Sequence, residues 1–463
     1  MNVMKLAMSS IAALAIGASA AAAADLGGDC CADLEERVAE LEATTARKGN
    51  RKVSLTVSGW VSQQIMWWDD GEESNVYLTD LGSISIGTHF AFSGKAQINS
   101  EWSAGFKIRL EVMNNDSLLV SQDADDGILS PGGAAQALVS GSSGPIGLES
   151  AYWFMQSERL GRVSVGQQSS AADNQAVLPD ASGSLLQANY PMYDVNAFFT
   201  RVNGARTGVV WGFLANCQGL DSYGGAFGDC DGVPHNNVRY DTPTFAGFSA
   251  SASWGEDDAW AVSGRYAGEF SGIKVAGAIA YHETTDETGP GLPTMLAARN
   301  NGGLDVGHLQ LGGYLEHVAS GLFVYGAYVE AYNNTTASIR GAGRTNPEGD
   351  MFYLKAGLKR KYFSIGSTTI YAEYGQKDDA FTASMYDAGV NTSELEQVGV
   401  GVVQNIDAAA MQMWLSWRHY DGDIGCSNAS AIAGAACSDF GLGSGNNDLD
   451  DFDLIKFGAL VNF

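Results

Sequence analysis

The sequence predicts an all-β protein, a 16-stranded antiparallel β-barrel that spans a membrane. The first observation is the last segment, Asp451–Phe463, in which apolar and polar residues alternate with the period of two that is typical of a β-strand. The second observation is that short and long connections alternate along the chain, as in membrane barrels. A strand that ends a chain leaves an unpaired edge, and pairing with the first strand removes that edge.

The chain begins with a predicted secretory signal, Met1–Ala24. It has Lys5, an apolar core at Leu6–Ala18 and small residues before Asp25, so the mature chain is expected to be exported. Loss of Lys5 takes the formal net charge from −27 to −28. Such acidity argues against nucleic acid as a partner and favours attraction of cations.

Residues 25–52 form a predicted N-terminal periplasmic segment with one short helix, Ala32–Lys48. Leu34, Val38, Leu41 and Thr45 are spaced by 4, 3 and 4 residues, which is the pattern of a short coiled coil. Two heptads are marginal as an isolated helix. The segment is therefore either a coiled coil of several copies or a solvated helix that serves as a linker.

Export permits disulfides, and the chain has six cysteines. Cys217 with Cys230, and Cys426 with Cys437, form two local pairs in Gly- and Asp-rich segments. Closing each loop would contribute roughly 3 kcal/mol in the chain-entropy model. The adjacent Cys30 and Cys31 have no obvious partner in the sequence.

From Val53 to the end, alternating segments predict the barrel itself, 53–463. The expected strands are Val53–Trp68, His89–Ile98, Ser103–Asn114, Leu148–Ser157, Arg162–Gln168, Asn236–Asp241, Gly247–Trp254, Ala259–Glu269, Gly272–Glu283, Leu304–His317, Gly321–Tyr332, Met351–Lys361, Gly366–Gln376, Glu394–Asn405, Ala409–Tyr420 and Asp451–Phe463. A soluble β-sandwich with its charged faces in water is the alternative. The alternating loop lengths favour the membrane barrel, with both chain ends on the periplasmic, short-turn side.

The longest connection runs from about residue 169 to 235 and contains the first cysteine pair. Connections of this length are usually functional or disordered. This one carries aromatic and apolar residues, so we expect it to pack against the rest of the protein.

Several stretches of the chain resemble the porin family of alphaproteobacteria. They are Ala32–Gly49, Ser164–Pro191, Cys217–Asp241 and Asn236–Trp260. The terminal Phe463 also resembles the assembly signal of bacterial outer-membrane barrels. The resemblance implies a 16-stranded, trimeric porin that passes small hydrophilic solutes, with its third long loop, about 169–235, folded into the barrel as a constriction.

The resemblance also implies a pore constriction where acids face bases. The candidate acids on the loop are Asp173, Asp180 and Asp194, and the candidate bases on the strands are Lys95, Lys107, Arg109, Arg162, Arg239 and Arg265. Opposed charges in a narrow pore tune charge selectivity. The alternative is that these charges form salt bridges in loops or lie at the rim. The acidic chain favours cations and the basic wall opposes them, so the sign of the selectivity stays open.

No enzyme motif is present: the sequence has no HExxH, GxSxG or P-loop, and its histidines are scattered. No cofactor or metal site is expected, although Asp123–Asp126 and Asp448–Asp451 could supply oxygen ligands to Ca²⁺.

The leading function is therefore passive diffusion of small hydrophilic solutes across the bacterial outer membrane, in contact with its lipid and lipopolysaccharide. One alternative is a selective channel, in which a sugar would slide along Tyr314, Tyr353, Tyr371 and Trp414. Another is a barrel that anchors the outer membrane to peptidoglycan.

Overall fold

The computed structural model describes residues 53–82, 86–112, 115–125, 146–215, 217, 226–231, 234–286, 304–333, 348–379, 389–427 and 437–463. The expected signal at 1–24, the helix expected at Ala32–Lys48, and Cys30 and Cys31 all lie outside these residues. No helix among the described residues is long and apolar enough to cross a membrane.

The described residues form one 18-stranded sheet and a separate two-stranded hairpin. Two short strands, β2 (Ser74–Thr79) and β19 (Gly445–Asp448), only extend β1 and β18, which leaves 16 strands in the wall. These are β1 Ser54–Asp69, β3 His89–Gln97, β4 Trp102–Val112, β5 Ile146–Ser157, β6 Gly161–Gln168, β9 His235–Asp241, β10 Phe248–Gly255, β11 Trp260–Phe270, β12 Ile273–Asp286, β13 Leu304–His317, β14 Leu322–Asn333, β15 Gly349–Phe363, β16 Gly366–Asp378, β17 Val390–Ile406, β18 Met411–Cys426 and β20 Phe452–Asn462.

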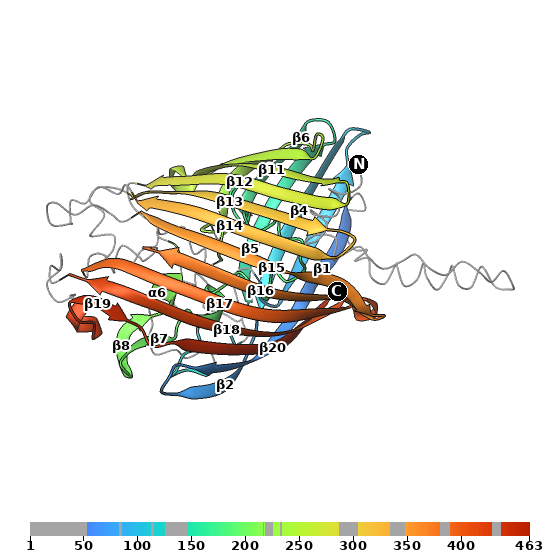
Figure 1. Ribbon diagram of the computed structural model, residues 1–463. Helices are drawn as coiled ribbons and strands as arrows, with labels where there is room; N and C mark the ends of the chain where they lie inside the picture. Colours follow the sequence, from blue (N-terminus) through green and yellow to red (C-terminus); the bar gives the residue numbers. More distant parts are fainter. Residues whose placement is uncertain are drawn as a thin grey trace.

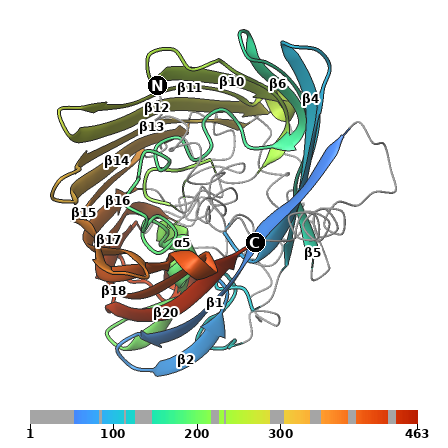
Figure 2. The ribbon, with the colours of Figure 1, turned by 90° about the vertical axis from the view of Figure 1, so that its right-hand side faces the viewer.

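The wall is a closed antiparallel barrel, as the sequence predicted. Each strand pairs with its neighbour in chain order, and β1 pairs with β20 from Trp60↔Asn462 to Asp69↔Asp453. The ring of strands is seen along its axis in Figure 2. Because β1 also pairs with β3, no edge of the wall strand β1 is left open.

The terminal strand β20 has the two faces that its alternation predicted. Phe457 is 47% exposed on the outward face, whereas the adjacent Lys456 is 4% exposed on the inward face. Large apolar residues are exposed on the outward face of the other strands too, which is the surface that a membrane barrel presents to lipid.

The wall is uneven in height. Strands β6, β9 and β10 have 8, 7 and 8 residues, whereas β15, β17 and β18 have 15, 17 and 16. The longer strands form the tall side of the barrel in Figure 1. The part of the barrel from β14 to β20 is called the tall wall below, and the part from β3 to β11 is called the low wall. The sequence located all 16 wall strands, with ends that differ by at most six residues, the largest difference being at the end of β18. It missed β2 and β19.

A row of carboxylates crosses the outward face of the tall side. Each is the direct cross-strand partner of the next, in the order Glu330, Asp350, Asp378, Glu394, Asp423 and Asp448. Like charges directly opposite one another destabilise a sheet. Six of the chain's 53 acidic residues thus lie on the outside of the barrel.

Candidate functional site

The connection between β6 and β9 lies against the inner face of the barrel. Its described part contains α5 (Met192–Val195), the hairpin β7 (Phe199–Val202) and β8 (Ala205–Val210), and α6 (Gly212–Ala215). Figure 2 shows α5 inside the ring of strands. The Cys217–Cys230 disulfide closes the end of this segment, and Cys426–Cys437 closes the loop after β18, so both predicted pairings are present.

The segment approaches the wall so closely that a glycine is needed beneath it. A Cβ added to Gly312 on β13 would lie 1.8 Å from the backbone oxygen of Ala176. Next to this contact, the Tyr325 hydroxyl of β14 donates a 2.9 Å hydrogen bond to the same oxygen. The absence of a side chain at Gly312 therefore lets the segment rest directly on the wall.

A buried ion pair fixes the first part of the segment. Lys355 on β15 contacts Asp180 with 2.5 Å between Nζ and Oδ2, and both side chains are fully buried. The Lys355 ammonium also donates to Asn189 Oδ1 at 3.0 Å. Nearby, Lys359 donates to the Ala181 carbonyl oxygen at 2.8 Å.

A second ionic contact fixes α5. The Asp194 carboxylate binds Arg418 of β18, Lys456 of β20 (2.5 Å) and the Tyr420 hydroxyl (2.8 Å). Arg418 also binds Glu373 of β16 at 2.8 Å. Burial by itself would raise the pKa of Asp194, but Arg418 and Lys456 outweigh burial and lower the pKa. The Asp194 carboxylate is therefore ionised, and the positive charges of Arg418 and Lys456 balance it.

Asp173 lies at the start of the segment and makes no contact of this kind. It is buried near Asp231, and burial together with that like charge raises the pKa of Asp173 to about 7. The Asp231 carboxylate binds His282 of β12 at 2.7 Å. Arg239 of β9 holds the backbone here, since its guanidinium donates to the Ser170 carbonyl oxygen at 2.7 Å.

The four inward aromatic residues proposed for a sugar slide are covered by the segment. Tyr314, Tyr353, Tyr371 and Trp414 are all buried in one hydrophobic cluster with residues of the segment. Phe227, for example, stacks on Tyr353 with 5.2 Å between ring centroids. These aromatics therefore fill the space between segment and wall, and a passing solute does not reach them.

The strand pairing puts all six candidate bases on the inward face of the low wall, β3 to β11. Arg109 binds Glu149 and Glu111, and Arg239 binds Asp241. Arg162 stacks on Phe154 at 4.0 Å, and Arg265 donates to Ser251 at 3.1 Å. These bases, with Lys95 and Lys107, extend across β3, β4, β6, β9 and β11.

The partners of the segment's acids are bases that the sequence pattern did not single out. Asp180 and Asp194 contact Lys355, Arg418 and Lys456 on the tall wall. Among the six candidate bases, only Arg239 has a hydrogen bond to the described part of the segment. The alternation did place Lys456 on the polar face of its strand, and the same signal could have found Lys355.

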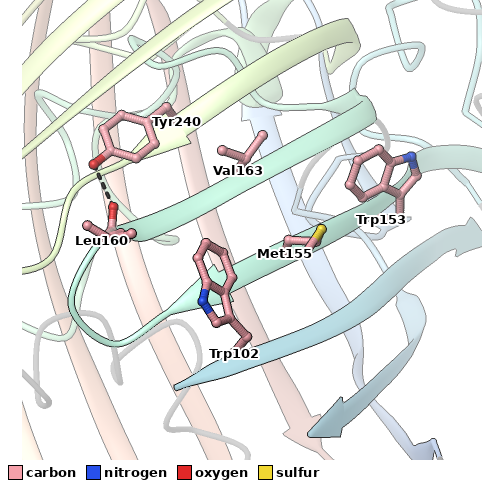
Figure 3. Close-up of a pocket in the computed structure, with 7 residues that line it drawn as sticks. Trp102, Trp153, Met155, Leu160, Val163 and Tyr240 are labelled. Carbon is pink, nitrogen blue, oxygen red and sulfur yellow. Dashed lines mark hydrogen bonds between the residues drawn. The ribbon is translucent and has the colours of Figure 1, made fainter. Parts of the chain in front are cut away.

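An apolar hollow of about 410 Å³ lies on the outward face of β4, β5, β6 and β9 (Figure 3). It is lined by Trp102, Trp153, Met155, Leu160, Gly161, Val163 and Tyr240. The Tyr240 hydroxyl closes one end by donating to the Leu160 carbonyl oxygen at 2.7 Å. Because it faces away from the candidate bases, the hollow is not part of the interior passage.

The described residues contain no group of three or more His, Cys, Asp or Glu side chains arranged to hold a metal ion. Two stretches were considered for Ca²⁺. In the first, Asp123 is bound to Arg206 at 3.0 Å, and in the second, Asp448 is the last residue of the outward row of carboxylates.

The chain matches one protein family and many solved structures. The family model for Gram-negative porins matches residues 10–411. Among solved structures, an anion-selective porin from Comamonas acidovorans has 14% identity and a TM-score of 0.49, with 89% of this chain and 100% of that chain covered. A Salmonella typhi OmpF complex with daunomycin has 13% identity and a TM-score of 0.49, with 89% and 98% covered. The comparison with curated proteins gives no match.

Proposed function

Because this chain belongs to the Gram-negative porin family, whose model matches residues 10–411, we propose that its segment between β6 and β9 is the constriction loop of a diffusion channel. The protein is an outer-membrane porin, a passive channel and not an enzyme. The proposal concerns which part of the chain narrows that channel.

The observation that carries the proposal is the burial of two charged side chains of the segment against the tall wall. Asp180 and Asp194 lie on Lys355, Arg418 and Lys456, which project inward from β15, β18 and β20. Buried ion pairs of this kind are costly to break, because each partner would be left as a buried, unpaired charge. The segment thus stays on one wall and leaves the passage beside β3 to β11.

General diffusion is favoured over a selective sugar channel. The inward aromatics that suggested a sugar site lie beneath the segment, so the passage lacks the stacking surface that these residues would have offered. Membership in the alphaproteobacterial branch, assembly as a homotrimer, and contacts with lipopolysaccharide and peptidoglycan stay predictions from the sequence.

Planar-bilayer recording of the purified protein tests this function. We expect steady, ohmic currents in symmetrical KCl, since an open barrel with a fixed constriction conducts without a saturable binding step. Neutral sugars added at low concentration should leave the current unchanged. Block by one particular sugar would instead indicate a selective channel, and the absence of any current would contradict the proposal.

A further inference from the structure

We propose that this channel prefers anions, and that Lys107, Arg162 and Arg265 set the preference. The inference rests on the proposed function, because it concerns the charge of the passage beside the constriction loop. It follows from which charges in the barrel are neutralised and which are not.

The three carboxylates between residues 169 and 199 do not face the passage. Asp173, Asp180 and Asp194 are 4%, 8% and 0% exposed. The last two bind bases of the tall wall, as described above. Between residues 169 and 199, the residues that keep partial exposure are all uncharged: Ser169, Asn174, Leu178, Ala181, Gly183, Leu185, Leu186, Asn196 and Phe199. Residues 169–199 therefore present a neutral surface to the passage.

The acids of the opposite wall each have a basic neighbour. Glu111 and Glu149 bind Arg109, and Asp241 binds Arg239. Glu269, near the end of β11, is the direct cross-strand partner of Lys274 on β12. Arg109 and Lys274 each serve two acids, because Lys274 also binds Glu316 of β13 at 2.9 Å. These contacts therefore leave two negative charges, fewer than the bases of this wall that form no ion pair.

Four bases on the same wall form no ion pair with a carboxylate of the described residues: Lys95, Lys107, Arg162 and Arg265. Arg162 is the direct cross-strand partner of Asp241, whose ion pair is with Arg239. Arg162 is held by stacking on Phe154 and Arg265 by a hydrogen bond to Ser251. Neither contact removes the positive charge. Lys107, Arg162 and Arg265 come from β4, β6 and β11, so they distribute this charge across the low wall.

The net charge of −27 does not describe the passage. Six of the acids form the outward row on β14 to β19, on the other side of the tall wall from the channel. A constriction with the neutral residues 169–199 on one side and an excess of bases over acids on the other concentrates anions, since fixed charges in a narrow pore select ions by sign.

The test is the zero-current potential of single channels under a KCl gradient at neutral pH. We expect the wild type to pass chloride more readily than potassium. The triple variant Lys107→Gln, Arg162→Gln, Arg265→Gln should lose this preference or reverse it. The charge-retaining variant Lys107→Arg, Arg162→Lys, Arg265→Lys should keep it, which separates charge from damage to the wall.

A matched control removes the same charge elsewhere. Arg159 and Lys361 form surface ion pairs, and Arg360 donates to carbonyl oxygens of the exposed turn at Ala319 and Ser320. Replacement of these three bases by Gln should leave the preference unchanged. A wild-type potential of cation sign overturns the inference, as does an anion preference that survives the triple variant or is lost in the control. The proposed function fails by a different measurement, the absence of conductance or block by one sugar.

Discussion

Replacement of Arg418 by Met is expected to destabilise the folded protein by about 3–5 kcal/mol, because it leaves buried carboxylates without their partner. Arg418 joins Glu373 of the wall to Asp194 of the segment that we propose as the constriction loop, and all three side chains are buried. Lys456 would still neutralise part of the charge on Asp194, but Glu373 would lose its ionic partner.

The midpoint of urea unfolding, followed by tryptophan fluorescence in detergent, measures this loss. Single-channel conductance should rise in the same variant, because α5 loses a main contact with the wall. The control is Arg206→Met, whose pair with Asp123 has side chains 31% and 47% exposed. Exposed pairs contribute at most about 1 kcal/mol. An equal shift in both variants would contradict a special role for the buried contact.

Replacement of Gly312 by Val is expected to lift the constriction loop from the wall. The first carbon of the new side chain would lie 1.8 Å from the Ala176 carbonyl oxygen, and the obstacle is backbone. Overpacking of this kind typically costs about 1–3 kcal/mol. We expect a larger conductance, together with faster protease cleavage within residues 169–199.

The neighbouring glycine provides the matched control. A Cβ at Gly313 has no atom within 4 Å, and this residue lies on the outward face of the same strand. Gly313→Val should therefore leave conductance and cleavage unchanged. If both valine variants behave alike, the effect comes from the strand and not from the contact with the loop.

The strands of the wall could be predicted because the alternation of residues within each strand reflects the surroundings of its two faces. In β20, the alternation of Phe457 and Val461 with Lys456 and Leu460 follows directly from lipid on one side and the interior on the other. The same alternation correctly predicts that Lys107 and Arg109 of β4 point inward. β2 was missed because it is six residues long and lies in a segment whose polar ends suggested a loop.

The contacts of the constriction loop were less predictable because they join residues far apart in the chain. Asp194 and Lys456 are 262 positions apart, and no periodicity links them. The sequence predicted that acids on the loop face bases on the strands, but the bases that it selected lie on the low wall. The structure places Asp180 and Asp194 on the tall wall, where inward Lys355 and Arg418 were available and burial excludes water.

The central claim, that ionic contacts hold the loop in place and so set the pore size, is tested most directly by uptake of neutral sugars of increasing size into liposomes. The double variant Asp180→Asn, Asp194→Asn removes the carboxylates that bind the wall. The control variant Glu101→Gln, Asp407→Asn removes two carboxylates from surface pairs outside the loop. The first variant should admit larger sugars than the wild type, and the second should not. An unchanged size limit in the first variant would contradict the account.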